Sequence, residues 1–225
     1  MNMAKPLLIL AAAVVTLGAA PPRGGWNGVV ALGADGSHVL GNPQAKVKLT
    51  EYISYTCPHC SKFTIEAEGA LQIAYVTPGR VSVEIRHMLR DPIDLTAAML
   101  TNCGPKEKFF QNHAAFMRRQ AQWIGPLGSA SPAQRQRWVS GNLAQRNRAI
   151  ASDFHFYEIM AARGYDRSTV DRCLGDAAMA QRIGKQAKDA YVLGVRYTPS
   201  FTINGKLLDD TFEWSDLRPQ IDASL

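Results

Sequence analysis

The chain has 225 residues, which is enough for one domain with a sizeable core or for one domain that carries an insertion. Hydrophobic residues make up 46% of it and charged residues 20%, as in an ordinary globular protein, and the formal net charge is +6. The densest basic group, in residues 135–148, has the spacing of a solvated helix face. We therefore expect no nucleic-acid partner.

The first twenty residues have the pattern of a secretory signal peptide. Lys5 supplies a positive charge, residues 6–17 are almost wholly apolar, and Gly18-Ala19-Ala20 offers small residues for cleavage after Ala20. The apolar run is short for a membrane span, which needs about 20 residues. An uncleaved anchor is the alternative. We expect cleavage and export to an oxidising compartment, where disulfides persist.

Residues 21–36 are rich in glycine and proline, and they predict a loose N-terminus with one short strand near residues 29–32. Gly41-Asn42-Pro43 predicts a turn. The β-branched and aromatic content of residues 47–53 predicts a strand, and residues 58–75 predict a helix that ends before Pro78-Gly79. A second strand is expected at 81–88. Strand, helix and strand at these lengths form a βαβ unit with a parallel pair.

Helical patterns then dominate from residue 92 to residue 176, and Ser131-Pro132 is a helix-start signal within them. Another helix is expected to end at Leu193. A strand at 201–203, a hairpin turn and a return strand at 206–208 follow, and Asp210 or Thr211 should begin a final helix. We thus expect an α/β fold with a βαβ…ββα order, made of residues 37–91 and 177–225, and an all-helical insertion domain at 92–176.

Cys57-Pro58-His59-Cys60 stands where the first predicted strand gives way to the first helix. Free N–H groups and the helix dipole favour negative charge at a helix N-terminus, and a thiolate is the nucleophile of disulfide chemistry. Pro58 suits the first helical turn, and His59 can add a polar partner near the Cys57 sulfur. The alternatives are a passive buried bridge or a metal clip. Zinc usually needs two further ligands at their own spacing, so we expect redox chemistry and no metal.

Four cysteines allow three disulfide pairings. We favour Cys57–Cys60 and Cys103–Cys173, and the second pair would close a long loop. The alternative is that Cys103 and Cys173 are two unconnected buried thiols.

Together these residues resemble a known family, the DsbA-like thiol:disulfide oxidoreductases of bacterial envelopes. The likeness is carried by the CPHC tetrad, the preceding Glu51, the turn at Gly41, and Thr198-Pro199 before a strand that ends in Asn204-Gly205-Lys206. It implies a thioredoxin fold with an inserted helical domain, over nearly all of the mature chain. The pair Cys103 and Cys173 resembles a variant of alphaproteobacterial members.

The resemblance implies roles for the tetrad. Cys57 matches the exposed nucleophile that forms a mixed disulfide with the substrate, Cys60 matches the buried partner that resolves it, and His59 stands where the family stabilises the thiolate with a histidine.

Outside the tetrad, Glu51 matches a buried acid that relays a proton to Cys60; the alternative is an ordinary strand-edge glutamate. Pro199 matches the cis-proline beside the cysteines, and the Thr198 backbone would pair with an extended substrate. The alternative is a plain proline at the start of a strand. The family's second buried charge has no clear counterpart, although Arg86 and His87 lie nearby in the sequence.

The expected function is therefore that of a periplasmic oxidoreductase that donates the Cys57–Cys60 disulfide to exported proteins. It would act without a cofactor, as a monomer, and would be re-oxidised by a DsbB-like, quinone-linked membrane protein. One alternative is a disulfide isomerase or reductase with the same site. The other is a metal-binding or substrate-holding chaperone.

Overall fold

The computed structural model describes residues 22 and 24–225, and the expected signal peptide at 1–20 lies outside them. Its centre is a six-stranded mixed sheet with the order β1-β2-β4-β3-β5-β6. The strands are β1 (Val30–Leu32), β2 (His38–Gly41), β3 (Val47–Ile53), β4 (Val81–His87), β5 (Ser200–Ile203) and β6 (Lys206–Leu207).

The predicted βαβ unit is present. Strands β3 and β4 are parallel, with Val47 opposite Val81 and Ile53 opposite His87. The helix α1 (Pro58–Leu71) connects them and continues into a π-helical turn, Gln72–Val76. Every other strand pair is antiparallel.

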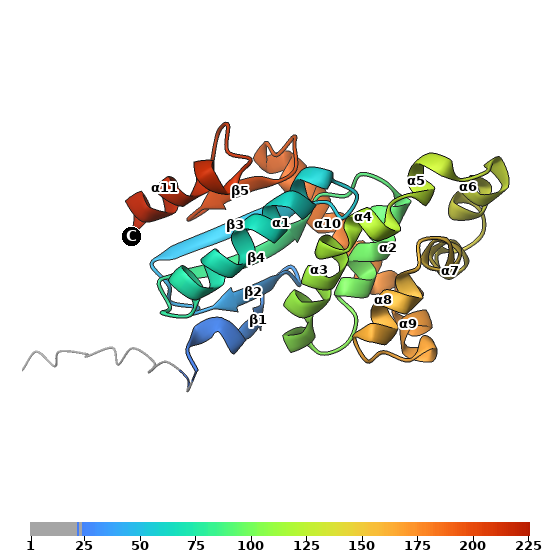
Figure 1. Cartoon of the computed structure of the whole chain (residues 1–225), viewed down its shortest axis with the longest axis horizontal. Coiled ribbons are helices and arrows are strands. Elements are labelled where there is room, and N and C mark those ends of the chain that lie inside the picture. Colours follow the sequence, from blue (N-terminus) through green and yellow to red (C-terminus); the bar gives the residue numbers. More distant parts are fainter. Residues whose placement is uncertain (1–21, 23) are drawn as a thin grey trace, which may run out of the picture.

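Helices cover both faces of the sheet, and α1 crosses in front of it in Figure 1, whereas α10 (Ala177–Leu193) lies behind. Successive residues of a strand point to opposite faces. Tyr52 of β3 accordingly packs with Ala190 of α10, while its neighbour Glu51 faces α1 and lines a small cavity with Phe63 and Thr64. Glu51 therefore lies on the α1 face of the sheet.

Strand β2 was not predicted from the sequence, from which only the turn at its end was expected. It pairs antiparallel with β4, and His38 lies opposite Ile85. Its four residues are too few to show an alternating pattern. The strand exists because the exposed edge of β4 offers backbone partners, which is tertiary information.

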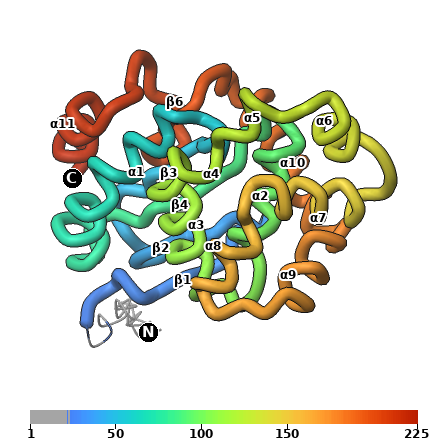
Figure 2. Tube along the Cα trace, turned by 45° about the vertical axis from the view of Figure 1, so that its right-hand side comes forward, coloured from blue at the N-terminus to red at the C-terminus, as the bar shows by residue number. Residues whose placement is uncertain are grey.

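The segment between β4 and α10 is helical, as predicted, and gathers at one end of the sheet (Figures 1 and 2). Ser131 caps the helix that begins at Pro132, with a reciprocal bond to Gln134. The helices are α2 (Pro92–Thr101), α3 (Phe109–Arg118), α4 (Gln120–Trp123), α5 (Pro126–Ser129), α6 (Pro132–Val139), α7 (Leu143–Asp153), α8 (Phe156–Ala162) and α9 (Arg167–Leu174).

A disulfide joins Cys103, which follows α2, to Cys173 in α9, with 5.7 Å between the two Cα atoms. The bridged residues are 70 positions apart in sequence. The bond therefore ties the start of the helical segment to its end.

The last helix, α11 (Trp214–Ser224), begins later than the predicted start at Asp210 or Thr211. Asp210 has a positive φ of 47°, which is outside the helical region. Glu213 and Asp216 instead form a capping box that fixes the start at Trp214. Among the described residues, no helix is both long and apolar enough to cross a membrane.

Candidate active site

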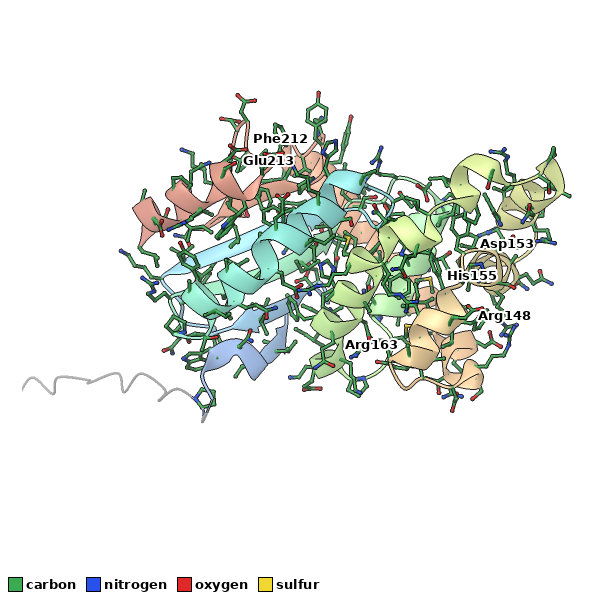
Figure 3. The ribbon with its side chains drawn as sticks, viewed as in Figure 1. Arg148, Asp153, His155, Arg163, Phe212 and Glu213 are labelled. Carbon is green, nitrogen blue, oxygen red and sulfur yellow. A yellow bond between two sulfur atoms is a disulfide. The ribbon has the colours of Figure 1, made fainter. Side chains whose placement is uncertain are left out.

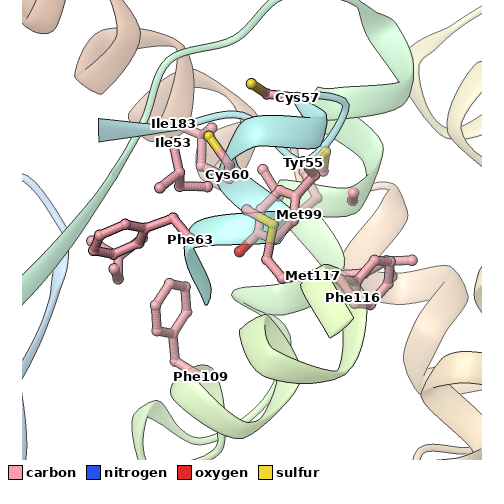
Figure 4. Close-up of a cluster of buried hydrophobic side chains, with 14 of the residues drawn as sticks. Ile53, Tyr55, Cys57, Cys60, Phe63, Met99, Phe109, Phe116, Met117 and Ile183 are labelled. Atoms are coloured by element: carbon pink, nitrogen blue, oxygen red, sulfur yellow. The ribbon is translucent and has the colours of Figure 1, made fainter. Parts of the chain in front are cut away.

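The two thiols of the tetrad lie at the start of α1. Cys57 is the N-cap residue, Pro58 is the first helical residue, and Cys60 lies within the first turn. Both cysteines are free thiols and belong to the buried cluster that also contains Tyr55 and Phe63 (Figure 4). The turn that precedes Cys57 follows β3 directly, so the N-terminus of α1 lies at the end of the sheet.

Thr198 and Pro199 reach the same place from the far end of the chain. They precede β5, which pairs antiparallel with β3, and the Thr198–Pro199 peptide bond is cis. The Cys57 sulfur lies 3.1 Å from the Thr198 carbonyl oxygen, and the protonated thiol donates a hydrogen bond to it. The structure thus brings together the tetrad and the threonine-proline pair.

The two sulfurs differ in acidity. A hydrogen bond from the Cys60 thiol lowers the pKa of Cys57 to about 5, and the Thr198 side chain and the backbone N–H groups of Cys60 and His59 add to this effect against the opposing effect of burial. Burial, together with Cys57 itself, raises the pKa of Cys60 well above its ordinary value. Cys57 is therefore the thiolate at neutral pH and Cys60 keeps its proton.

His59 contributes its backbone N–H to the Cys57 thiolate, while its side chain is exposed. No hydrogen bond joins the imidazole ring to the Cys57 sulfur in the described part of the chain. The contacts that the structure gives this sulfur come from the Cys60 thiol, from Thr198 and from the backbone N–H groups at the helix start, rather than from the imidazole ring.

Cys57 is less exposed than expected for the attacking thiol, with only 2% of its surface accessible. The Thr198 loop and the first turn of α1 cover it. Its sulfur is reached through a surface hollow of about 290 Å3, lined by residues of three segments: Cys57 and His59; Met88, Leu89 and Arg90; and Arg196, Tyr197 and Thr198.

Glu51 is buried beneath the tetrad, and its Oε1 atom has no hydrogen-bond partner among the described residues. Burial raises its pKa to about 8, and the charge of Glu68 adds to the shift. The cavity that Glu51 shares with His113 has a volume of about 30 Å3, which is room for a water molecule. The charge of Glu51 in turn helps to raise the pKa of Cys60.

Neither Arg86 nor His87 supplies a buried charge next to Glu51. Arg86 lies opposite Tyr52 in the sheet, hence on the α10 face, and pairs with Asp35 at 3.2 Å and Glu84 at 2.9 Å. His87 is buried, and burial lowers its pKa to about 3, so it is neutral.

Two residues of the helical segment hold the active-site turn and were missed by sequence reasoning. The Gln120 amide donates to the carbonyl oxygens of Tyr55 (2.7 Å) and Cys57 (2.9 Å). The Asp94 carboxylate accepts from the N–H of Tyr55 at 2.7 Å. No local motif marks a glutamine or an aspartate as a partner of backbone groups so distant in sequence.

Within residues 22 and 24–225, no group of three or more His, Cys, Asp or Glu side chains is arranged to hold a metal ion. The chemistry that the geometry offers is that of an activated thiolate, a protonated resolving thiol and a buried carboxyl group.

A family model described as thioredoxin matches residues 34–223 of the chain. The chain belongs to the thioredoxin family. Among solved structures, this thioredoxin-family chain is 57% identical to the protein-disulfide isomerase from Novosphingobium aromaticivorans, with a TM-score of 0.81 over 84% of this chain and 97% of the other.

Two further proteins are similar to this thioredoxin-family chain. Wolbachia pipientis α-DsbA1 shares its fold, with a TM-score of 0.66 and 24% identity over 85% of this chain and 92% of the other. A Rickettsia typhi protein named as a protein-disulfide oxidoreductase is 32% identical over 109 residues. That match spans 43% of this chain and 40% of the relative's length.

Proposed function

We propose that this protein is a periplasmic thiol:disulfide oxidoreductase that oxidises exported proteins by donating a disulfide formed between Cys57 and Cys60. The observation that carries the proposal is the set of hydrogen bonds that lowers the pKa of Cys57 to about 5. Stabilising this thiolate stabilises the reduced enzyme, so the oxidised enzyme gives its disulfide away readily.

The proposed reaction begins with attack by a substrate thiolate on the Cys57 sulfur of the oxidised enzyme. The Cys57–Cys60 bond breaks, its electron pair goes to the Cys60 sulfur, and a mixed disulfide joins Cys57 to the substrate. A second substrate thiolate then attacks the substrate sulfur of the mixed disulfide and displaces the Cys57 thiolate. Two electrons pass to the enzyme, and the low pKa of Cys57 makes its sulfur a good leaving group.

Glu51 is proposed to supply the proton that Cys60 needs as its sulfur leaves. With a pKa of about 8 it is protonated at neutral pH, whereas an ordinary glutamate would not be. Its charge affects the pKa of Cys60, so the two groups interact. During re-oxidation the same carboxylate would take the proton back.

Substrate would bind along the Thr198 backbone beside Cys57, in the manner of an added strand. The 2.9 Å and 2.7 Å bonds from Gln120 and the 3.1 Å contact to Thr198 support a site whose parts are already in place in one chain, and hence action as a monomer. The disulfide at Cys103 and the signal-like first twenty residues support export. A DsbB-like, quinone-linked membrane protein would re-oxidise the enzyme.

Isomerase activity is the second candidate, because the 57% identical Novosphingobium structure carries the name protein-disulfide isomerase. An isomerase must be held reduced and must reshuffle wrong disulfides, whereas an oxidase must be held oxidised. The same Cys57 thiolate could serve either role.

The deciding experiment is the reduction potential of the Cys57 and Cys60 couple, measured by equilibration with glutathione buffers. A value of about −120 mV, as DsbA has, is expected of an oxidase. A value of about −270 mV, as thioredoxin has, would contradict disulfide donation. A refolding assay with scrambled disulfides then separates isomerase from oxidase activity, with C57A as the inactive control.

A further inference from the structure

The hollow through which Cys57 is reached combines apolar walls with two arginines. Met88, Leu89 and Tyr197 supply the apolar surface, and Arg90 and Arg196 line the same hollow. No aspartate or glutamate is among the described residues that line it. A substrate segment that enters to reach Cys57 therefore meets positive charge.

Arg196 is held in place by neutral groups. Its Nη1 atom donates to the carbonyl oxygens of Tyr191 at 2.6 Å and Val195 at 3.0 Å, and its Cζ atom lies 4.0 Å from the centre of the Tyr191 ring. None of the ion pairs between the described residues includes Arg196, so no carboxylate compensates its charge. A guanidinium has five N–H donors, and those left over are available to a ligand.

Arg90 is exposed, and its side chain makes no hydrogen bond or ion pair to any residue that the structure describes. Its backbone is fixed, because its N–H donates to Asp94 Oδ2 at 3.0 Å. The neighbouring acidic residues, Asp91 and Asp94, accept hydrogen bonds from neutral groups and do not line the hollow. Asp91 accepts from the Thr56 hydroxyl at 2.6 Å and from the Asp94 N–H at 2.8 Å.

The acidic residue next to Phe212 is also paired. Phe212 and Glu213 project from the segment before α11 (Figure 3), and the Phe212 ring lies 6.4 Å from the Tyr197 ring. Glu213 pairs with Lys62 at 2.6 Å. In the described part of the chain, the arginine, lysine, aspartate or glutamate side chains that line the hollow are thus Arg90 and Arg196.

We propose that Arg90 and Arg196 make the enzyme prefer polypeptide substrates that carry an aspartate or glutamate within two residues of the reactive cysteine. The inference rests on the proposed function. Arg196 precedes Thr198 by two residues, and both residues line the hollow beside Cys57. A substrate strand with its cysteine at Cys57 and paired at Thr198 therefore carries the residues next to its cysteine past Arg196.

The test uses a set of dithiol peptides that differ only two positions from the attacking cysteine, on either side, with glutamate, glutamine or lysine there. The kcat/KM for oxidation by the full, disulfide-loaded enzyme should fall from glutamate to glutamine to lysine, by roughly three- to tenfold overall, as exposed charge pairs allow. Raising NaCl from about 50 mM to about 500 mM should remove most of the preference, because salt screens exposed charges.

The variant R90Q/R196Q should bring the glutamate-to-lysine ratio close to one. R80Q is the matched control, because Arg80 is also exposed, donates Nη2 to a carbonyl oxygen, that of Ala74, and lies over a tyrosine ring, that of Tyr75. It directly precedes β4, whereas the hollow lies beyond the other end of that strand. This control should keep the wild-type ratio.

Equal rates for the three peptides, or a ratio that survives in R90Q/R196Q, would overturn the inference and leave the proposed function standing. Failure of the wild-type enzyme to oxidise any of the peptides would overturn the proposed function, and the inference with it. The salt dependence of the wild-type enzyme tests the charge preference even where the double variant does not fold, and a preference that persists at about 500 mM NaCl would contradict it.

Discussion

The side-chain amide of Gln120 donates a hydrogen bond to the carbonyl oxygen of Cys57, at 2.9 Å, and a second one to that of Tyr55, at 2.7 Å. Gln120 is the first residue of α4, in the helical segment, and it is buried. Asp94 of α2 accepts a hydrogen bond from the N–H of Tyr55, at 2.7 Å. The helical segment therefore fixes the turn whose N–H groups point at the Cys57 sulfur.

We expect Q120L to raise the pKa of Cys57 by about one unit, because the turn loses two hydrogen bonds that orient its N–H donors, each worth about 1 kcal/mol. The pH dependence of Cys57 alkylation by iodoacetamide measures this pKa. The matched control is Q122L, which changes an exposed glutamine on the same short helix. An unshifted alkylation profile in Q120L would show that the amide only stabilises the fold.

The reaction chemistry was predictable from the sequence because it depends on local patterns. A strand that ends at Ile53, a proline after Cys57 and a tetrad at a helix start all follow from residues within one stretch. The family resemblance then implied Thr198 and Pro199, and the structure places the Thr198 carbonyl 3.1 Å from the Cys57 sulfur.

What could not be predicted depends on contacts between distant segments. The burial of Cys57 comes from the Thr198 loop, 141 residues away, and the clamp on the turn comes from Gln120, 63 residues beyond Cys57. The lack of a charged partner for Glu51 among the described residues is likewise a matter of which face of the sheet Arg86 occupies. Periodicity within one segment contains none of this information.

The reduced protein should become more stable than the oxidised protein as the pH rises. Its Cys57 pKa is about 5 in the fold against 9.0 ordinarily, so the unfolded chain binds more protons between these values and folding stability increases with pH. From pH 4 to pH 7 the reduced form should gain roughly 3 kcal/mol over the oxidised form. Cys60, with its raised pKa, stays protonated and adds nothing in this range.

Urea unfolding of both forms at a series of pH values measures this difference. The Cys57→Ser variant is the control, since a serine at this position does not titrate, and its stability should lack the gain. Parallel curves for the reduced and oxidised wild-type proteins would contradict the pKa that the proposed function depends on.

Removing the second disulfide should destabilise the protein without changing its redox chemistry. The Cys103–Cys173 bond closes a loop of 70 residues, and such bonds are typically worth about 2–4 kcal/mol. The double variant C103A/C173A should lose about that much stability in urea unfolding. The glutathione-equilibrated potential of Cys57 and Cys60 should stay the same, and a changed potential would mean that the bond also shapes the active-site turn.

Replacing Glu51 should make the free energy of unfolding less dependent on pH, because the pKa of Glu51 is raised in the folded protein. Burial raises its pKa to about 8, against 4.5 ordinarily, so the folded protein binds the extra proton between these values and loses stability as the pH rises through them. E51Q, which stays neutral, should match wild type near pH 4.5 and exceed it by several kcal/mol at pH 8 in urea unfolding. E66Q, which changes an exposed glutamate on α1, is the control and should show no such divergence.

In the E51Q variant, oxidation of substrate should slow at neutral pH, because Cys60 loses its proton donor. Stability curves of E51Q and wild type that stay parallel from pH 4.5 to pH 8 would mean that Glu51 titrates as an ordinary carboxyl group, and it could then hold no proton for Cys60.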